Sequence, residues 1–355
     1  MESGCEFTLE LKPSTRIDVI DVQGRFRESF GDCLKGFRKA LYYSYHTTAG
    51  YFEETLCARL DHDPDLVRRF VDSYHRLFPP GANYFHDQLH LRKELSEIQR
   101  RNEPRNADSH LTFIGSGLTN CATYTVRNGR PVYFVDLDGV FGETVRTRRT
   151  SVIPYNFERR VDSLEAEIGV SNHSVVSVNL NDQRLGLMER IRERIAGSGV
   201  RRGRVDIVLA PSERNAGLTV NEYETLLMRH DLVDVLRNPF RFMAERWRHA
   251  LQNPRAVPGK MLNYAKYDLV QVVNQLVDAL RLRDTLAEKA LDKFLGVPAE
   301  RFLRMKRSVS LMISGEGRNG GGTIVEGTYQ SPILIQWQRS EARSRRLLID
   351  FIQFE

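Results

Sequence analysis

The hydrophobic and polar positions of this chain follow the same order in its two halves. In the first half, an alternating segment at 17–22 precedes apolar residues at helical spacing and then an aromatic, strand-like run at 41–45. The second half has a β-branched segment at 175–180, helical spacing over 185–195 and a strand-like run at 205–209. Each half therefore predicts strand, helix and strand. The positions at helical spacing are Phe26, Phe30, Cys33, Leu34 and Phe37, and then Leu185, Met188, Ile191 and Ile195.

The turn after the second strand carries the same ending in both halves. It reads His46-Thr47-Thr48-Ala49-Gly50 in the first half and Glu213-Arg214-Asn215-Ala216-Gly217 in the second. Alignment on the Ala-Gly pair places Glu213 opposite His46. A shared order of elements with a shared turn predicts one structural unit that occurs twice.

Beyond these turns the halves differ, because the second carries a helix-rich insertion at about 239–307. We assign residues 1–157 to the first copy and 173–355 to the second, with the acidic and polar segment 158–172 as the junction. The remaining predicted elements are a helix at 65–78, strands near 112–114, 122–126 and 132–137, and late strands at 308–313, 323–330, 333–338 and 343–352.

Composition narrows the class of protein. The 355 residues are 41% hydrophobic and 28% charged, as in globular proteins, and no apolar run approaches the ~20 residues of a membrane span. The N-terminus lacks the pattern of a signal peptide, and the four cysteines show no CxxC spacing, so we expect a cytoplasmic protein with reduced thiols. The net charge of +6 is spread among acidic residues. It fits a phosphate-bearing ligand better than nucleic acid.

Three histidines of the first half, His46, His86 and His110, are candidates for chemistry, because each lies near a threonine or an aspartate. Neutral imidazoles can ligate a divalent metal such as zinc or magnesium, with a neighbouring carboxylate to fix the tautomer. The same side chains can bind phosphate as imidazolium, act as acid and base, or satisfy local backbone groups. Spacing alone leaves these alternatives open.

Several short motifs together resemble the YjbQ family, whose members are described as secondary thiamine-phosphate synthases. The resemblance covers nearly the whole chain, as two tandem, degenerate copies. The motifs are His46 to Gly50, Tyr84 to Asp87 and Asn106 to Leu111 in the first copy, and Ala216 to Glu222, Gly327 to Gln330 and Arg345-Arg346 in the second. Each copy keeps motifs that the other has lost.

The resemblance implies an α+β fold, with a β-sandwich flanked by helices in each copy, and assembly as a homo-oligomer, a trimer in the family. It also implies one composite site that draws on both copies. The implied roles are catalysis for His46, His110 and Glu222, metal binding for His46, His86 and His110, and substrate binding for Thr47, Thr48, Asn221, Tyr329, Gln330 and Arg345. The alternatives for Glu222 and Arg345 are a solvated helix start and an exposed strand face.

Two functions are compatible with the sequence. The first is a YjbQ-like enzyme for a small phosphorylated or heterocyclic substrate, a transferase by resemblance, which joins a pyrimidine methyl pyrophosphate to a thiazole phosphate with loss of pyrophosphate. The second is a repurposed, non-catalytic scaffold whose helical insertion binds a partner. An apolar stripe between Tyr264 and Leu280 is the candidate surface for the second function, although such stripes more often form a core.

Overall fold

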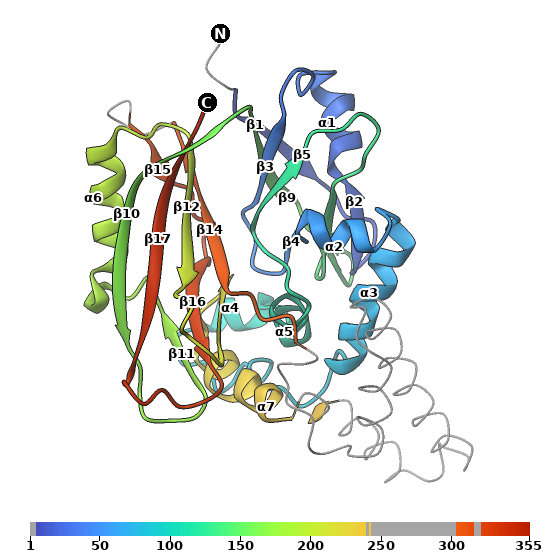
Figure 1. Ribbon diagram of the computed structural model, residues 1–355. Coiled ribbons are helices and arrows are strands. Elements are labelled where there is room, and N and C mark those ends of the chain that lie inside the picture. Colours follow the sequence, from blue (N-terminus) through green and yellow to red (C-terminus); the bar gives the residue numbers. More distant parts are fainter. Residues whose placement is uncertain (1–4, 239–240, 243–302, 316–320) are drawn as a thin grey trace, which may run out of the picture. The chain divides into compact units, whose positions relative to one another are not determined.

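The computed structural model describes residues 5–238, 241–242, 303–315 and 321–355 (Figure 1). Its helix and strand contents of 26% and 34% confirm the α+β class. The chain divides into two compact units, and each unit takes segments from both halves of the sequence. The β unit comprises Met1–Ala58, Gly117–Tyr223 and Met305–Glu355, and the helical unit comprises Arg59–Ser116 and Glu224–Arg304. The boundaries proposed for the two copies stay a prediction.

The first half contributes two sheets to the β unit, and the helix α1, Val22–Phe30, follows β2. A four-stranded sheet has the order β1-β9-β3-β5, and a three-stranded sheet has the order β2-β6-β4. A short hairpin, β7 and β8, precedes β9. The strands are β1 Phe7–Leu11, β2 Asp18–Asp21, β3 Lys39–Ser44, β4 Ala49–Tyr51, β5 Cys121–Thr125, β6 Tyr133–Asp136, β7 Val140–Phe141, β8 Thr144–Val145 and β9 Arg148–Tyr155.

The second half contributes two sheets with a corresponding order. One sheet runs β10-β17-β12-β14-β15 and the other β11-β16-β13, so that each strand of the first half except the β7–β8 hairpin has a counterpart at the same place, and β15 is added at one edge. Figure 1 shows the long β10 and β17 side by side. The strands are β10 Glu158–Gly169, β11 Val176–Asn179, β12 Gly203–Leu209, β13 Ala216–Asn221, β14 Ser308–Ser314, β15 Thr323–Ile324, β16 Ser331–Gln336 and β17 Ser344–Phe354.

The register also corresponds at the Ala-Gly pairs. Ala49 pairs with Asp136, the last residue of β6, and Ala216 pairs with Gln336, the last residue of β16. The Ala-Gly pairs, which the sequence placed in turns, begin the strands β4 and β13 and occupy the same register position in the two halves.

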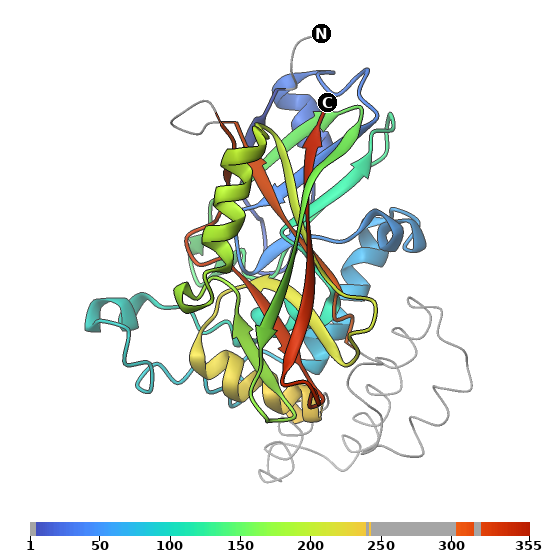
Figure 2. The ribbon, with the colours of Figure 1, turned by 60° about the vertical axis from the view of Figure 1, so that its left-hand side comes forward.

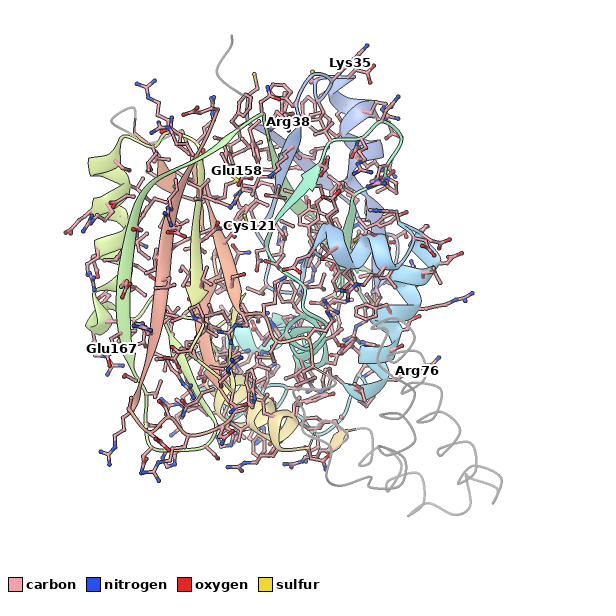
Figure 3. All side chains as sticks on the ribbon, in the orientation of Figure 1. Lys35, Arg38, Arg76, Cys121, Glu158 and Glu167 are labelled. Carbon is pink, nitrogen blue, oxygen red and sulfur yellow. The ribbon has the colours of Figure 1, made fainter. Side chains whose placement is uncertain are left out.

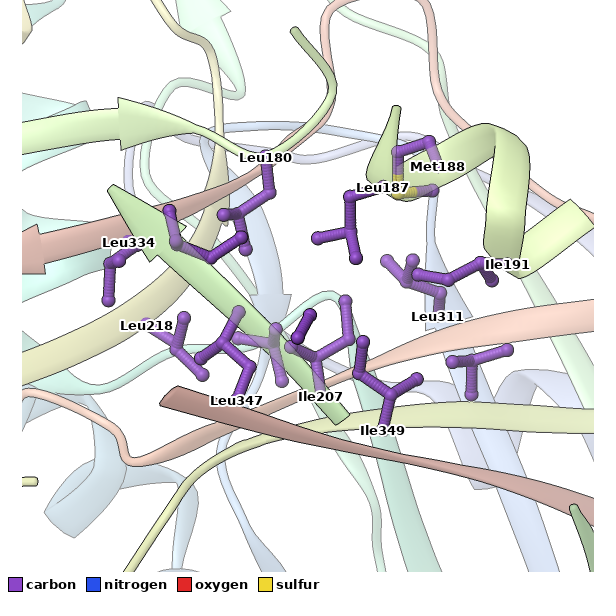
Figure 4. Packing of buried hydrophobic residues seen from close by; sticks show 14 of the residues in the cluster. Leu180, Leu187, Met188, Ile191, Ile207, Leu218, Leu311, Leu334, Leu347 and Ile349 are labelled. Atoms are coloured by element: carbon purple, nitrogen blue, oxygen red, sulfur yellow. The ribbon is translucent and has the colours of Figure 1, made fainter. Parts of the chain in front are cut away.

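The core of the second half lies between its two sheets and α6, Leu187–Ser198 (Figure 4). Val205, Ile207 and Leu209 alternate with less buried residues along β12, so one face of this strand is apolar. The face meets Leu187, Ile191 and their neighbours on α6, which lies along the larger sheet in Figure 2. Gly199, in the left-handed region at a φ of 69°, ends the helix.

A second apolar cluster joins the two halves within the β unit. It combines first-half residues such as Tyr43 and Tyr155 with Met312 of β14. The rings of Tyr155 and Phe354 stack with their centroids 3.9 Å apart. Glu158, labelled in Figure 3, accepts hydrogen bonds from both terminal nitrogens of Arg204 and from the Tyr155 hydroxyl, which lowers the pKa of Glu158 to about 2 although burial acts in the opposite direction. The halves therefore share a packed interface in this unit.

The helical unit has α3 and α5 as packed helices. Asp63 caps α3 by accepting from two backbone N–H groups, and Pro64 stands in its first turn, so the predicted helix at 65–78 is confirmed. The described helices outside α1 and α6 are α2 Glu54–Arg59, α3 Pro64–Leu77, α4 Glu97–Asn102, α5 Ala107–Ser116, η1 Gln183–Leu185, η2 Leu227–Asp231 and α7 Leu232–Arg237. No helix in the described residues is long and apolar enough to cross a membrane.

Several local expectations were wrong. Helical spacing continued to Phe37, but α1 stops at Phe30 because Gly31 takes a φ of 65°. The strand expected near 112–114 is part of the fully buried helix α5, where an apolar run does not reveal its period. The segment 158–172 holds the 12-residue strand β10, and its place as the junction between the copies stays a prediction. Most of the insertion, with the stripe from Tyr264 to Leu280, lies outside the described residues.

Candidate functional site

The His46 loop connects β3 to β4 in the β unit. The backbone N–H of Arg149 donates to Nε2 of His46 over 2.7 Å. Burial lowers the pKa of His46 to about 3, and the positive charges of Arg148, Arg149 and Arg146 lower it further. The ring is therefore neutral at physiological pH, and with Nε2 engaged as an acceptor its proton lies on Nδ1. His46 is thus arranged to donate a hydrogen bond without carrying charge.

Three carboxamide side chains hold the backbone of this loop. Asn120 Nδ2 donates to the carbonyl oxygen of His46 at 2.5 Å, and Gln330 Nε2 donates to the same oxygen at 3.0 Å. Asn221 Nδ2 donates to the carbonyl oxygen of Thr47 at 2.8 Å. Asn221 and Gln330 belong to the second half of the sequence, so side chains from both halves hold the His46 loop.

Gln330 has all four of its hydrogen-bonding positions occupied. Its Nε2 also donates to the Ser44 carbonyl at 2.7 Å, and its Oε1 accepts from the Tyr43 hydroxyl and from the N–H of Gly327. A residue that is 5% exposed and fully paired holds the loop in place and has no donor left for a ligand. Its neighbour Tyr329 is 66% exposed and keeps its hydroxyl and ring accessible.

The Arg148 frame lies beside the loop and was not predicted from the sequence. We use this name for Arg148 with Asp136, Asp138 and Thr48. Arg148 binds the two carboxylate oxygens of Asp136 through Nε at 2.6 Å and Nη2 at 2.7 Å, and it donates to the carbonyl of Asp138. A longer contact of 3.4 Å reaches the hydroxyl of buried Thr48. The Arg148-Arg149 pair, which parallels Arg345-Arg346 in the second half, was the sequence signal for it.

Arg345 lies in the second half of the β unit. The sequence predicted it as a phosphate ligand. Its guanidinium is 5% exposed and binds Gln336, Glu213 and two backbone carbonyls. The alternative of an exposed strand face is wrong for Arg345, because this side chain is buried, and its role in substrate binding stays a prediction. Arg346, the next residue, points to the surface instead.

His86 and His110 lie in the helical unit, where both are 1% exposed. Their ring nitrogens approach within 4.8 Å, and His86 Nδ1 lies 3.0 Å from a carboxylate oxygen of Asp87. This contact fits a histidine whose proton lies on Nδ1, and Nη1 of Arg92 lies 3.5 Å from its Nε2. Asp231, which the sequence did not single out, accepts from the backbone N–H of Phe85 and His86. Burial raises the pKa of Asp231 to about 7 despite these bonds.

Glu222 follows β13 in the β unit and is half-buried, and its backbone N–H donates to Oδ1 of Asn221. The sequence placed Glu222 and His46 in one site with His86 and His110. Because these residues belong to different units, that combination stays a prediction.

The comparisons with known proteins gave no matching family model and no matching curated protein. Solved structures resemble about half of the chain. A hypothetical protein from Aeropyrum pernix K1 is 14% identical over 54% of this chain and 98% of its own, with a TM-score of 0.28. A YbjQ-like protein of unknown function from Sulfolobus solfataricus P2 is 15% identical over 56% and 99%, with a TM-score of 0.27.

A third structure, an uncharacterized conserved protein of the YjbQ family from Clostridium acetobutylicum, is 15% identical over 53% of this chain and 98% of its own, with a TM-score of 0.27. All three likenesses have TM-scores below 0.5. At such TM-scores they transfer no residue role to this chain.

Acid should destabilise the protein through His46. The pKa of this histidine is about 3 in the folded chain and about 6.5 when unfolded, so the unfolded state binds an extra proton between these values. The contribution of His46 to stability is therefore complete above about pH 6.5 and is lost as the pH falls toward 3. Melting temperatures of the wild type and His46→Gln from pH 4 to 8 measure it, since glutamine can accept the same N–H without titrating. Parallel pH profiles would contradict the lowered pKa.

Proposed function

We propose that the chain is an enzyme that binds a small phosphorylated or heterocyclic substrate at the His46 loop. The observation that carries this proposal is a neutral, partly exposed imidazole whose Nε2 is engaged by the protein, in the positive field of Arg146, Arg148 and Arg149. Such a group stabilises developing negative charge on a ligand oxygen without first losing or gaining a proton. Thiamine-phosphate-synthase-like transfer is the reaction class that the YjbQ resemblance suggests.

Arg148 and Arg149 have different functions in this proposal. Arg148 is neutralised by Asp136 and acts on the position of the loop, whereas Arg149 is exposed and stacks its guanidinium 3.8 Å from the ring centre of Tyr45. A stacked, solvent-facing guanidinium has free donors for a phosphate or pyrophosphate group. In the proposed reaction Arg149 and the Nδ1–H of His46 would bind the departing pyrophosphate.

The same proposal includes an origin by tandem duplication of a YjbQ-like unit. It is supported by the corresponding strand orders and by the equal register of Ala49 and Ala216. It explains why the loop carries its histidine in one half while Asn221 and Gln330 come from the other. The trimeric or other homo-oligomeric state that the resemblance implies can be checked by light scattering.

A divalent metal is a separate part of the proposal, with His86 and His110 as two of its ligands. Imidazole donors suit zinc better than magnesium, which prefers carboxylate and water oxygens. Purified wild-type protein should then contain zinc by elemental analysis, and His86→Gln should contain less than a tenth of it per folded chain. Equal zinc in both proteins, or none in the wild type, would exclude these histidines as ligands.

Direct assays test the enzymatic function. We expect inorganic pyrophosphate to bind the wild type in calorimetry, and pyrophosphate to be released when the pyrimidine pyrophosphate and thiazole phosphate are supplied together. Binding with no turnover would reject the transferase reaction and keep the anion site. No binding and no turnover would reject the enzyme in favour of the scaffold.

A further inference from the structure

The second half contains a counterpart of the His46 loop, with the same backbone bond and a different side chain. The N–H of Arg346 donates to Oε1 of Glu213 at 3.0 Å, just as the N–H of Arg149 donates to Nε2 of His46 at 2.7 Å. The loop residue therefore accepts from the corresponding strand N–H in each half.

The buried arginines correspond as well. Arg345 donates through Nε to Gln336 at 3.1 Å and through Nη2 to the carbonyl of Gln338 at 2.8 Å. Arg148 makes the corresponding two contacts with Asp136 and with the carbonyl two residues further on. We call Arg345, Gln336, Gln338 and Glu213 the Arg345 frame.

The two frames differ in where the carboxylate lies. In the first, Asp136 on the strand neutralises Arg148, and the loop residue is uncharged. In the second, Glu213 in the loop neutralises Arg345 at 2.9 Å, and Gln336 on the strand is uncharged. In each frame one carboxylate thus pairs with the buried guanidinium, at exchanged positions, while the carboxylate of Asp138 in the first frame pairs with Arg146. An unpaired buried charge is strongly destabilising, so each guanidinium requires one carboxylate. When the carboxylate lies on the strand, the loop residue is neutral, and when it lies in the loop, the strand residue is neutral.

We infer that the Arg345 frame is a counterpart of the His46 site that cannot bind a ligand, because hydrogen bonds within the protein occupy its loop side chain. Both oxygens of Glu213 are engaged, one by the N–H of Arg346 and one by Arg345. By contrast, the contacts of the Arg148 frame and the hydrogen bond from Arg149 do not use Nδ1 of His46. Of these two loops, the His46 loop therefore binds a ligand and the Glu213 loop does not; this last step rests on the proposed function.

Exchanging the charged and the neutral side chain of the Arg345 frame tests this inference, because Glu and Gln have nearly the same shape. Glu213→Gln leaves Arg345 without its carboxylate, and Gln336→Glu gives it two. The double variant Glu213→Gln/Gln336→Glu restores one carboxylate, at the strand position that Asp136 occupies in the first half. We expect each single variant to lower the melting temperature by on the order of 5 °C, and the double variant to regain at least half of the summed loss.

The Gln336→Glu substitution also removes a hydrogen bond that does not involve Arg345. Gln336 Nε2 donates to the carbonyl of His173 at 2.9 Å, and glutamate cannot do so. This loss occurs in both the single Gln336→Glu variant and the double variant, so it cancels in the coupling between the two sites. Additive losses in the double variant would overturn the inference. If Gln336→Glu does not fold, a double variant that folds gives the same support, and one that also fails to fold overturns it.

Titration with inorganic pyrophosphate tests the number of sites. We expect one pyrophosphate per chain, unchanged in the double variant. Two equivalent sites per chain would overturn the inference. If pyrophosphate does not bind at all, the proposed function fails, whereas the thermal cycle still decides whether the Arg345 frame is charge-exchanged.

Discussion

Arg148→Met should lower the free energy of unfolding by about 3–5 kcal/mol, because it leaves the carboxylate of Asp136 buried without its cation. Asp136 is 0% exposed and receives two charged hydrogen bonds from this arginine. Urea denaturation of the purified variant measures the loss. The loop should loosen as well, since the guanidinium also contacts Thr48.

The matched control removes an arginine from an exposed pair. Arg25 lies 3.2 Å from Glu28, and both side chains are more than half exposed. Arg25→Met should therefore change stability by less than about 0.5 kcal/mol. The double variant Arg148→Met/Asp136→Leu removes both charges and should regain more than half of the loss. If the double variant is as unstable as Arg148→Met alone, packing and not the orphaned charge explains the effect.

Short-range patterns predicted part of the β unit, including β3, β6 and β12, but not β1, β9 or β10. Strands such as β12 were visible because one face is buried, which imposes alternation on the sequence. Helix α5 was missed because all ten of its residues are buried, and an element that is buried on every side shows no alternation between an apolar and an exposed face. The end of α1 was missed because Gly31, and not a change of hydrophobicity, stops it.

The site was predicted unevenly, for a related reason. A turn motif named His46, and the alignment on Ala-Gly placed it opposite Glu213, which accepts a backbone N–H from Arg346 as His46 does from Arg149. The function of Gln330 as a loop clamp could not be read from the sequence, because it depends on contacts nearly 290 residues away. The pairing of Arg148 with Asp136 was also out of reach, since any of several nearby carboxylates was an equally good partner by sequence.

The imidazole of His46 should itself contribute to the binding of an anion. His46→Ala should weaken binding of inorganic pyrophosphate about 10- to 100-fold, because a hydrogen bond to a charged group contributes about 1.5–3 kcal/mol. The fold should change little, since the N–H of Arg149 that loses its acceptor is exposed to water. Calorimetry measures the affinity, and the melting temperature measures the fold. His173→Ala, at an exposed histidine of the same unit, should bind like the wild type.

His46→Gln separates the two functions of the ring. Glutamine can accept the Arg149 N–H and keep the loop in place, but it cannot supply a donor at the position of Nδ1. Equal weakening by alanine and glutamine would assign binding to the Nδ1–H donor. Wild-type affinity in the glutamine variant would show that the loop backbone and the arginines bind the anion without the imidazole. Because the neutral ring is the donor, affinity should also show no loss as the pH rises through 6.5, whereas a site that needs imidazolium would lose the anion there.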